Sequence, residues 1–440
     1  MTESAPGMTS ERRLLHEGWP VVLLFGAFPL WWLLGLGGLI WPLLAMPMFL
    51  QLLRKESVEV PRGLGIWLLF LAWMMASLVQ VDEPGSRIVA IHRASLYLSA
   101  TILFVYVYNV SPSVVPRIFR GLAFFWAMVV IIGVVALLLP SWELRSPLEV
   151  VLPRSLAEVP YVHDLTHVRL SQVQDLFGSP VPRPAGPFTY TNEWGASFAL
   201  LTLFTIPTMI LKPRPWKWLV PFLALAAILP LVVSLNRGAW LSLGLGLAYA
   251  TVRMALRGRM GAVSGMMISI VVVVGLVIAT PLGGIFEDRL ESQDSTTTRF
   301  QLYRYVLQEV EVSPLFGNGA PEKVDPRLPE IGTHGAFWLV LYSHGIPALL
   351  LFLAFPIMVF WRSRRARSPL RFWPHVVILI AIIQMPYYNL LATDIHILMV
   401  AAALSLRPDE SIDHRMSAGE DRWSLGAGVS GSVVVRGSMG

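Results

Sequence analysis

Long apolar runs recur along this 440-residue chain and limit its possible folds more than any other feature. Residues 121–139, for example, carry no charged side chain. About 20 such residues form a helix long enough to cross the hydrocarbon core of a bilayer. With 55% hydrophobic and 14% charged residues and a mean hydropathy of +0.61, the chain is expected to be an all-α polytopic membrane protein.

The apolar runs predict about twelve transmembrane helices, the first two forming a tight hairpin around the glycines of GLGG. These helices are expected at 20–35, 37–53, 63–81, 88–108, 117–139, 192–211, 216–235, 237–256, 262–282, 335–361, 374–391 and 393–406. Because twelve is even, both termini are expected on the same side of the membrane. The short polar N-terminus lacks a cleavage pattern, so we expect it to be retained.

The distribution of basic residues predicts the orientation. One alternate set of connections holds 22 of the 34 Lys and Arg residues, and the other set holds 12, nine of them in two long polar intervals. By the positive-inside rule the first set is cytoplasmic, so both intervals face outward. The predicted segments are a cytoplasmic N-terminus (1–18), five helices (19–139), an outer loop (140–191), four helices (192–282), a second outer loop with surface helices and catalytic residues (283–334), three helices (335–406) and a disordered cytoplasmic tail (407–440).

Several functional classes lack support in the sequence. The chain has no cysteine, which excludes disulfides and thiolate chemistry. It has no Walker A sequence, dinucleotide fingerprint or serine-hydrolase elbow in a supporting context. The net charge of +6 is explained by the membrane topology, so no nucleic-acid partner is expected. A reaction would have to draw its energy from an activated donor.

Arg237 is the only charged residue between positions 218 and 252. A guanidinium beside hydrocarbon is costly, so this one must lie at a membrane edge or have a function. The predicted topology places it at the outer edge, where one helix turns into the next. A snorkelling anchor is one interpretation, and binding of an anion is the other.

The second outer interval contains a predicted surface helix at 297–311, capped by Ser295 or a following threonine. Its expected apolar stripe consists of Phe300, Tyr303, Leu307 and Val310. Arg299 falls in the first turn of this predicted helix, where free N–H groups already favour an anion. An arginine there is therefore expected to bind something negative, unless it is an ordinary solvated residue.

Further candidates lie at the predicted outer edge. His334 opens the tenth helix, where a neutral imidazole could accept a proton near pH 7 or could be structural. Arg183, Tyr190 and Asn192 lead into the sixth helix, and Arg93 lies near the outer end of the fourth. Arginines in these positions favour an anionic substrate from the outer leaflet, such as a polyprenyl diphosphate, because guanidinium groups bind phosphate oxygens bidentately.

One cluster suggests a metal. His163 and His167 in the sequence HDLTH are four residues apart, which on a helix places both on one face, as in an H-E-x-x-H zinc site. The segment follows Pro160 in a loop of undefined structure. We therefore expect surface histidines and no metal or cofactor, with zinc as the alternative.

Five short motifs, in order, resemble the O-antigen ligase and polymerase superfamily. They are R-x-x-G-x-F-x-x-x-N (183–192), SLNRG (234–238), S-x-x-x-R-x-x-x-Y (295–303), PLFGNG (314–319) and a histidine (334) eleven residues before Gly345. The coverage runs from about residue 180 to 350. One departure is Gly335, where members of this superfamily often have asparagine.

Within the superfamily the chain is similar to the O-antigen ligases. The resemblance implies a GT-C-like, metal-independent glycosyltransferase in the bacterial inner membrane with its active site facing the periplasm. It also implies that Arg237 and Arg299 hold the undecaprenyl diphosphate of the O-antigen donor, that His334 is the essential histidine, and that Arg183 lies near the same phosphates. The predicted substrate-binding set also includes Arg289, Tyr303, Tyr190, Asn192 and Arg93.

The implied acceptor is the lipid A core, and the expected reaction inverts the anomeric centre in one displacement. We expect a monomer surrounded by membrane lipids. The alternatives are an O-antigen polymerase that uses the same donor and, in a different class, a lipid-linked sugar transporter. No internal repeat is visible, and the polar residues gather at the predicted outer edge, which favours an enzyme over a transporter.

Overall fold

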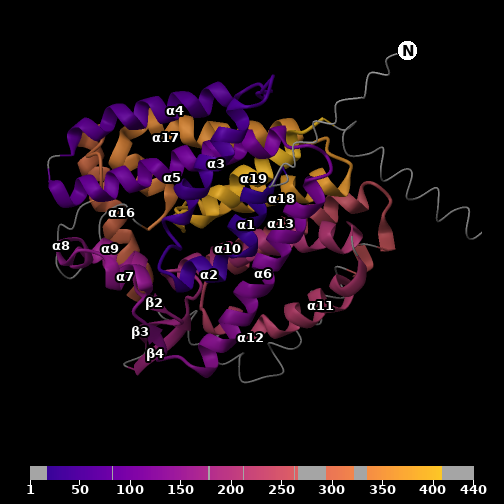
Figure 1. Cartoon of the computed structure of the whole chain (residues 1–440), viewed down its shortest axis with the longest axis horizontal. Coiled ribbons are helices and arrows are strands. Elements are labelled where there is room, and N and C mark those ends of the chain that lie inside the picture. Colours follow the sequence, from indigo (N-terminus) through magenta and orange to yellow (C-terminus); the bar gives the residue numbers. More distant parts are fainter. Residues whose placement is uncertain are drawn as a thin grey trace, which may run out of the picture.

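The computed structural model describes residues 17–81, 83–176, 179–211, 213–261, 263–265, 294–321 and 334–408. This part of the chain is mostly helical, and helices of very different sequence position pack side by side (Figure 1). Among the described residues, five helices are long and apolar enough to cross a membrane: Gly85–Asn109, Val115–Leu138, Thr191–Leu211, Pro215–Val233 and Ala336–Ser363. Four shorter apolar helices accompany them: Ile40–Leu53, Leu64–Gln80, Pro369–Gln384 and Thr393–Leu406. The chain is a multi-pass membrane protein, and the number twelve stays a prediction.

The helices in the first half of the chain follow the predicted spans with local breaks. They are α1 (Trp19–Gly26), α2 (Phe28–Leu33), α3 (Ile40–Leu53), α4 (Leu64–Ser77), the 3-10 helix η1 (Leu78–Gln80), α5 (Pro84–Asn109) and α6 (Val115–Leu138). The first arm of the predicted hairpin is therefore two short helices. Pro29 is the second residue of α2 and lacks an N–H, so the hydrogen bonding of α1 cannot continue through it.

The second half contains α10 (Thr191–Leu211), α11 (Pro213–Ala226), α12 (Ile228–Val233), α13 (Arg237–Ala255), α16 (Asp294–Val312), α17 (Ala336–Ser363), α18 (Pro369–Gln384) and α19 (Thr393–Leu406). Two expectations need correction. The predicted span 216–235 is divided into α11 and α12, and the predicted span 374–391 is helical only as far as Gln384. Pro386 follows, and because it cannot donate an N–H, residues 385–392 form a turn. The predicted span 262–282 lies almost entirely outside the described residues.

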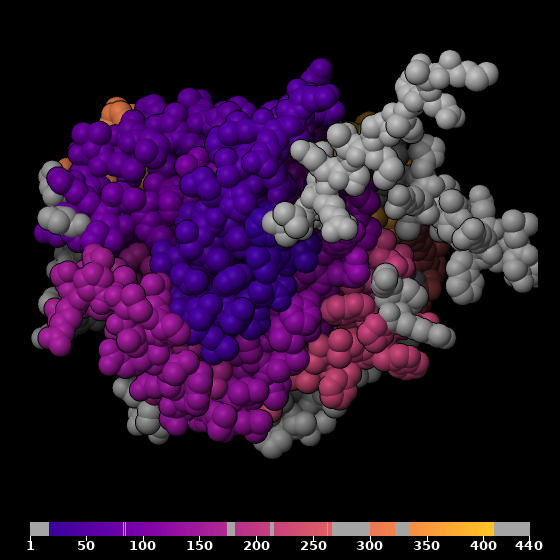
Figure 2. All heavy atoms as spheres, in the orientation of Figure 1, coloured from indigo at the N-terminus to yellow at the C-terminus, as the bar shows by residue number. Residues whose placement is uncertain are grey.

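The first outer interval is not all helical. Short helices α7 (Pro147–Val151), α8 (Arg154–Ala157) and α9 (Pro160–Thr166) alternate with strands β1 (Glu143–Leu144), β2 (Val168–Arg169), β3 (Ser171–Leu176) and β4 (Ser179–Pro184). Strand β1 pairs antiparallel with β2, and β3 with β4. These elements lie together at the lower left of Figure 1, and Figure 2 shows them against the N-terminal helices. From the sequence we expected only helices here and missed these strands. The alternation of polar and apolar residues in β3 is too short to have indicated a strand.

The predicted cytoplasmic connections meet at one end of the helix bundle. Arg407 donates hydrogen bonds to the carbonyl oxygens of Val107 and Val110, each at 2.7 Å, at the end of α5. Arg257 donates to Ala366 O at 2.7 Å. Arg407 thus satisfies carbonyl groups that the end of α5 leaves without partners, and Arg257 bonds the connection between α17 and α18. The basic residues therefore stabilise this end of the bundle in addition to their predicted role in orientation.

Helix α17 is sharply kinked at Gly345, whose φ of 78° and ψ of −177° are not helical. The kink and the missing N–H of Pro347 leave the carbonyl oxygens of Tyr342 and Ser343 without their usual helical N–H donors. The PLFGNG segment satisfies them. Asn318 N donates to Tyr342 O at 2.9 Å and Gly319 N donates to Ser343 O at 2.7 Å.

The same segment fits the kink closely because of its glycines. Ile346 N, freed by the kink, donates to Pro314 O at 2.8 Å. Gly317 has a φ of 63°, and a Cβ atom there would lie 2.4 Å from Tyr342 O. PLFGNG therefore docks the chain after α16 onto α17, which gives this motif a structural explanation.

Helix α16 confirms that a helix lies in the second outer interval, but its register differs from the prediction. The helix begins at Asp294 rather than 297, so Arg299 is its sixth residue and lies in the second turn. The expected stripe is also wrong in part, because Phe300 and Leu307 are exposed. The buried side chains that pack inward are Leu302, Val306 and Val310, spaced by four residues.

We predict that Gly317→Ala lowers the free energy of unfolding by about 2 kcal/mol, because the new Cβ meets a backbone oxygen in a left-handed conformation. Thermal unfolding of the purified protein in detergent measures the effect. Gly244→Ala is the matched control, since a Cβ at Gly244 meets nothing within 4 Å. An equal melting temperature for the two variants would contradict the docking of PLFGNG.

Candidate active site

Arg237 follows a turn of only three residues between α12 and α13. Leu235 in this turn has a φ of 54°, a left-handed conformation that a branched side chain adopts at a cost of about 1–3 kcal/mol. Asn236 is buried, with 2% of its surface exposed. A turn with these features persists only when surrounding contacts hold it.

The side chain of Arg183 supplies part of that support. Arg183 is 6% exposed, and from β4 its Nε donates to Ser234 O at 2.7 Å. Its Nη2 donates to Asn236 Oδ1 at 3.3 Å. At least two N–H groups of this guanidinium thus fix the turn that precedes Arg237. The sequence-based role of Arg183 in substrate binding stays a prediction.

The start of α10 contributes the next contacts. Asn236 Nδ2 donates to Thr191 O at 2.7 Å, and Thr191 Oγ1 donates to Arg183 O at 3.3 Å. A Cβ atom at Gly195 would lie 2.3 Å from Asn236 Nδ2. Glycine at this position is therefore what allows α10 to approach the turn.

Arg237 itself is the first residue of α13 and is half-buried. Asn236 is the N-cap residue, but its side chain makes no capping hydrogen bond. The N-terminal end of α13 therefore combines a guanidinium with the positive end of a helix dipole. Both favour a bound anion.

A turn between α18 and α19, residues 385–392, connects this helix end to the other predicted catalytic segments. Tyr388 is 3% exposed, and its Oη accepts a hydrogen bond from Ala239 N at 2.8 Å. A Cβ atom at Gly238 would lie 2.8 Å from the same oxygen. The glycine of SLNRG is therefore needed for the approach of Tyr388.

The segment of His334 meets the same turn. Ala336 N donates to Tyr388 O at 2.8 Å and Phe337 N donates to Met385 O at 3.0 Å. Gly335 has a φ of 146°, and a Cβ atom there would lie 2.6 Å from Pro386 O. The backbone thus favours glycine at this position, because the side chain of any other residue would be strained and would contact Pro386.

Helix α16 completes the assembly through Tyr303. Its Oη lies 3.3 Å from both His334 O and Pro386 O, so its one O–H is shared between these two carbonyl oxygens. The Tyr303 ring stacks on Trp338, with ring centroids 4.1 Å apart. Arg299 lies one helical turn before Tyr303, and only its backbone is described. The argument from free N–H groups of a first turn does not apply to Arg299, because the helix starts earlier than predicted.

The remaining predicted residues lie in different surroundings. Tyr190 Oη donates to Asp164 Oδ2 at 2.6 Å. Burial and the Asp164 carboxylate raise the pKa of Tyr190, so its phenol stays protonated at neutral pH.

Asn192 is half-buried in the first turn of α10. Arg93 lies 5.7 Å from the ring of Tyr161 and lines a small pocket with His344. Arg289 lies outside the described residues.

Tyr388 and Asn236 were not identified from the sequence. Tyr388 falls within a predicted span, and Pro386 was the signal that the span ends earlier. Asn236 lies inside the SLNRG motif, but a buried amide next to a charged residue has no distinctive pattern. The assembly brings together backbone segments carrying Arg237, Arg299 and His334, whereas Tyr190 and Arg93 contact the outer loop.

Three segments far apart in sequence, the start of α13, helix α16 and the segment of His334, thus meet at the 385–392 turn. Residues 222–353 match the family model described as O-antigen ligase. Over these residues the chain is similar to the O-antigen ligase family. This family includes O-antigen ligases and polymerases, both of which are enzymes that act on lipid-linked O-antigen. No curated protein matches the chain.

We predict that Tyr388→Phe destabilises the protein by about 1 kcal/mol, because Ala239 N loses one acceptor in a buried position. Thermal unfolding in detergent measures this change. Tyr387→Phe is the control, since Tyr387 is 41% exposed. Indistinguishable melting temperatures for the two variants would show that the hydroxyl group does not support the start of α13.

Proposed function

We propose that this protein transfers O-antigen from undecaprenyl diphosphate to the lipid A core on the periplasmic face of the inner membrane, by an inverting and metal-independent reaction. The observation that carries the proposal is the position of Arg237. It begins α13 at a helix end without a side-chain cap, and Tyr388 connects this end to the segment that carries His334. An anion-binding helix end and an imidazole are the two groups that such a transfer requires.

The donor is recognised through its diphosphate. A guanidinium fork binds phosphate oxygens bidentately and keeps its charge. Arg237 and Arg299 would share the negative charge that develops on the diphosphate as the bond between its oxygen and C1 of the sugar breaks. The N-terminal N–H groups of α13 add to this stabilisation. Arg183 supports the same charge indirectly, by holding the turn before Arg237.

The acceptor is activated by His334. A hydroxyl group of the lipid A core attacks C1 from the face opposite the diphosphate, and the imidazole takes its proton. One bond from the acceptor oxygen to C1 forms, one bond from C1 to the diphosphate oxygen breaks, and undecaprenyl diphosphate leaves. Gly335 and Ala336 pack on the 385–392 turn and would thereby hold His334 in a fixed position relative to α13. Fixing the reacting groups relative to one another would increase the rate of transfer.

We predict that Arg237→Ala reduces transfer by at least about 100-fold, because a positioned charge that acts on the leaving group is lost. The assay follows the lipopolysaccharide ladder formed by purified protein from undecaprenyl-diphosphate-linked glycan and lipid A core in detergent. Arg154→Ala, an exposed arginine of the outer loop, is the control and should keep the wild-type rate. A well-folded Arg237→Ala protein with the wild-type rate would contradict this assignment.

We predict that His334→Ala lowers transfer by about 10²-fold or more at an unchanged melting temperature, since a general base contributes this much. Transfer by the wild type should continue in excess chelator. The reaction products also distinguish an O-antigen ligase from an O-antigen polymerase. A ladder on lipid A core identifies a ligase, whereas extension of the lipid-linked donor alone would identify a polymerase.

A further inference from the structure

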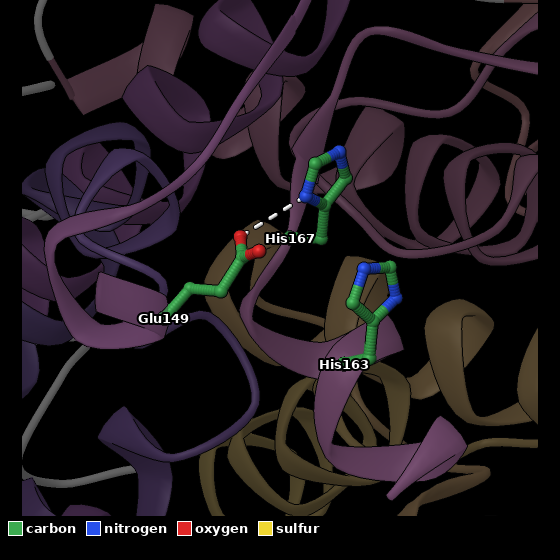
Figure 3. A group of neighbouring side chains, drawn as sticks. All are labelled: Glu149, His163 and His167. Atoms are coloured by element: carbon green, nitrogen blue, oxygen red, sulfur yellow. Dashed lines mark hydrogen bonds and ion pairs between the residues drawn. The ribbon is translucent and has the colours of Figure 1, made fainter. Parts of the chain in front are cut away.

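A second cluster of chemically active side chains lies in the outer loop, apart from the candidate active site. Within the described part of the chain, Glu149, His163 and His167 each offer one donor atom, and these atoms all lie within 4.8 Å of one another. Figure 3 shows Glu149 from α7 directed toward His167, with His163 beside them on α9. The sequence predicted a pair of surface histidines, and folding adds a carboxylate that lies 14 residues before the first of them.

The best-defined pair in the cluster already has the spacing of two metal ligands. His167 Nδ1 lies 3.0 Å from Glu149 Oε2. Zinc bonds of about 2.0–2.1 Å in a tetrahedral site place ligand atoms about 3.3 Å apart. The two atoms could thus bind one ion with little movement. His163 is exposed and would move its donor atom by up to about 1.5 Å, the difference between 4.8 Å and that spacing.

The second nitrogen of His167 has the partner that a ligating histidine needs. His167 Nε2 lies 3.5 Å from Glu143 Oε2. A histidine that binds a metal through one nitrogen usually directs the other N–H at a carboxylate, which fixes the ring and raises its basicity. Glu143, on β1, occupies this position. A protonated His167 hydrogen-bonded to both Glu143 and Glu149 would have the same geometry. Zinc titration distinguishes this protonated state from the metal-bound state.

The charges of the cluster also favour a cation. Glu149 is 8% exposed, and a buried carboxylate needs compensation. Glu149 is paired with Arg145, at 3.4 Å between Nε and Oε1, but the side chain of Arg145 is 73% exposed. With neutral histidines, two glutamates and one arginine leave one negative charge. Two imidazoles and a carboxylate form a donor set that suits zinc.

The backbone around the cluster is fixed by contacts that do not involve the donor atoms. Ser146 Oγ accepts a hydrogen bond from Glu149 N at 3.1 Å and caps α7. His167 N donates to His163 O at 2.8 Å, so both histidines stay on one side of α9. The His163 and His167 rings stack with centroids 5.0 Å apart. The donor groups are therefore arranged before any ion binds.

We propose that the outer loop binds one zinc ion through Glu149, His163 and His167, with Glu143 holding His167 and water as the fourth ligand. The ion would join α7 to α9. Helix α9 contacts the membrane helices at two points, because Tyr161 Oη lies 2.7 Å from His92 Nδ1 on α5 and Asp164 accepts from Tyr190 before α10. Zinc would thus stabilise the contact of the outer loop with α5 and α10. This site is independent of the proposed transfer reaction.

Binding tests the site directly. Tag-free full-length protein in detergent is stripped with chelator and titrated with Zn²⁺ in competition with a chromophoric chelator. We expect one ion per chain, with an affinity at least about 10-fold lower in His163→Ala and in Glu149→Gln. Glu158→Gln, an exposed carboxylate of the same loop, is the control and should bind like the wild type.

A second readout tests the structural role. Zinc should raise the melting temperature of the wild type and of Glu158→Gln, because an ion that binds only the folded state stabilises it, and it should not raise that of His163→Ala. Equal zinc affinity in wild type and His163→Ala, or no binding at a one-to-one ratio, would overturn the site. The alternative is then the protonated His167 between Glu143 and Glu149. Binding without any change in melting temperature would overturn the proposed stabilisation of the outer loop.

Discussion

A polypeptide in a bilayer must satisfy its backbone N–H and C=O groups within the protein, because the hydrocarbon offers no hydrogen-bonding partner. Every interruption of a membrane helix therefore needs a specific neighbour. The kink of α17 at Gly345 meets this need through PLFGNG, whose backbone N–H groups satisfy Tyr342 O and Ser343 O. Both glycines of that segment are needed, because a Cβ atom at Gly317 would contact Tyr342 O and one at Gly319 would contact the side chain of Val81.

The turn before Arg237 depends on the same constraint. Its left-handed Leu235 and buried Asn236 are supported by Arg183 from β4 and by Thr191 at the start of α10. Tyr388 then connects the first turn of α13 to the segment of His334. A change at any of these partners is expected to move Arg237 relative to His334, and small displacements of reacting groups are costly for catalysis. The support of the site is thus spread over elements outside the matched family region as well as inside it.

The outer loop adds a second set of constraints on α5 and α10. Helix α9 contacts His92 through Tyr161, and Asp164 accepts a hydrogen bond from Tyr190. Its strands and helices are short, and small units of this kind often depend on an additional crosslink. The chain has no cysteine, so a disulfide cannot join α7 to α9. The proposed zinc ion would supply such a crosslink.

The sequence alone determined the features that depend on local composition. Apolar runs of membrane length predicted α5, α6, α10 and α17 close to their observed bounds, because burial in lipid demands about 20 apolar residues whatever the neighbours are. The predicted helix near 297–311 also exists. The motifs identified the O-antigen ligase family, whose model matches residues 222–353.

Only the tertiary structure decided which residues meet. The turn at Tyr388, the inward role of Arg183 and the approach of Glu149 to His167 join positions that are distant in sequence, and side-chain contacts of this kind leave no periodic signal. The register of α16 was wrong for a related reason, since its buried face is set by packing on α17 rather than by its own pattern of apolar residues. Local composition fixes where helices form, and the partners of their interrupted backbone groups fix how the site is assembled.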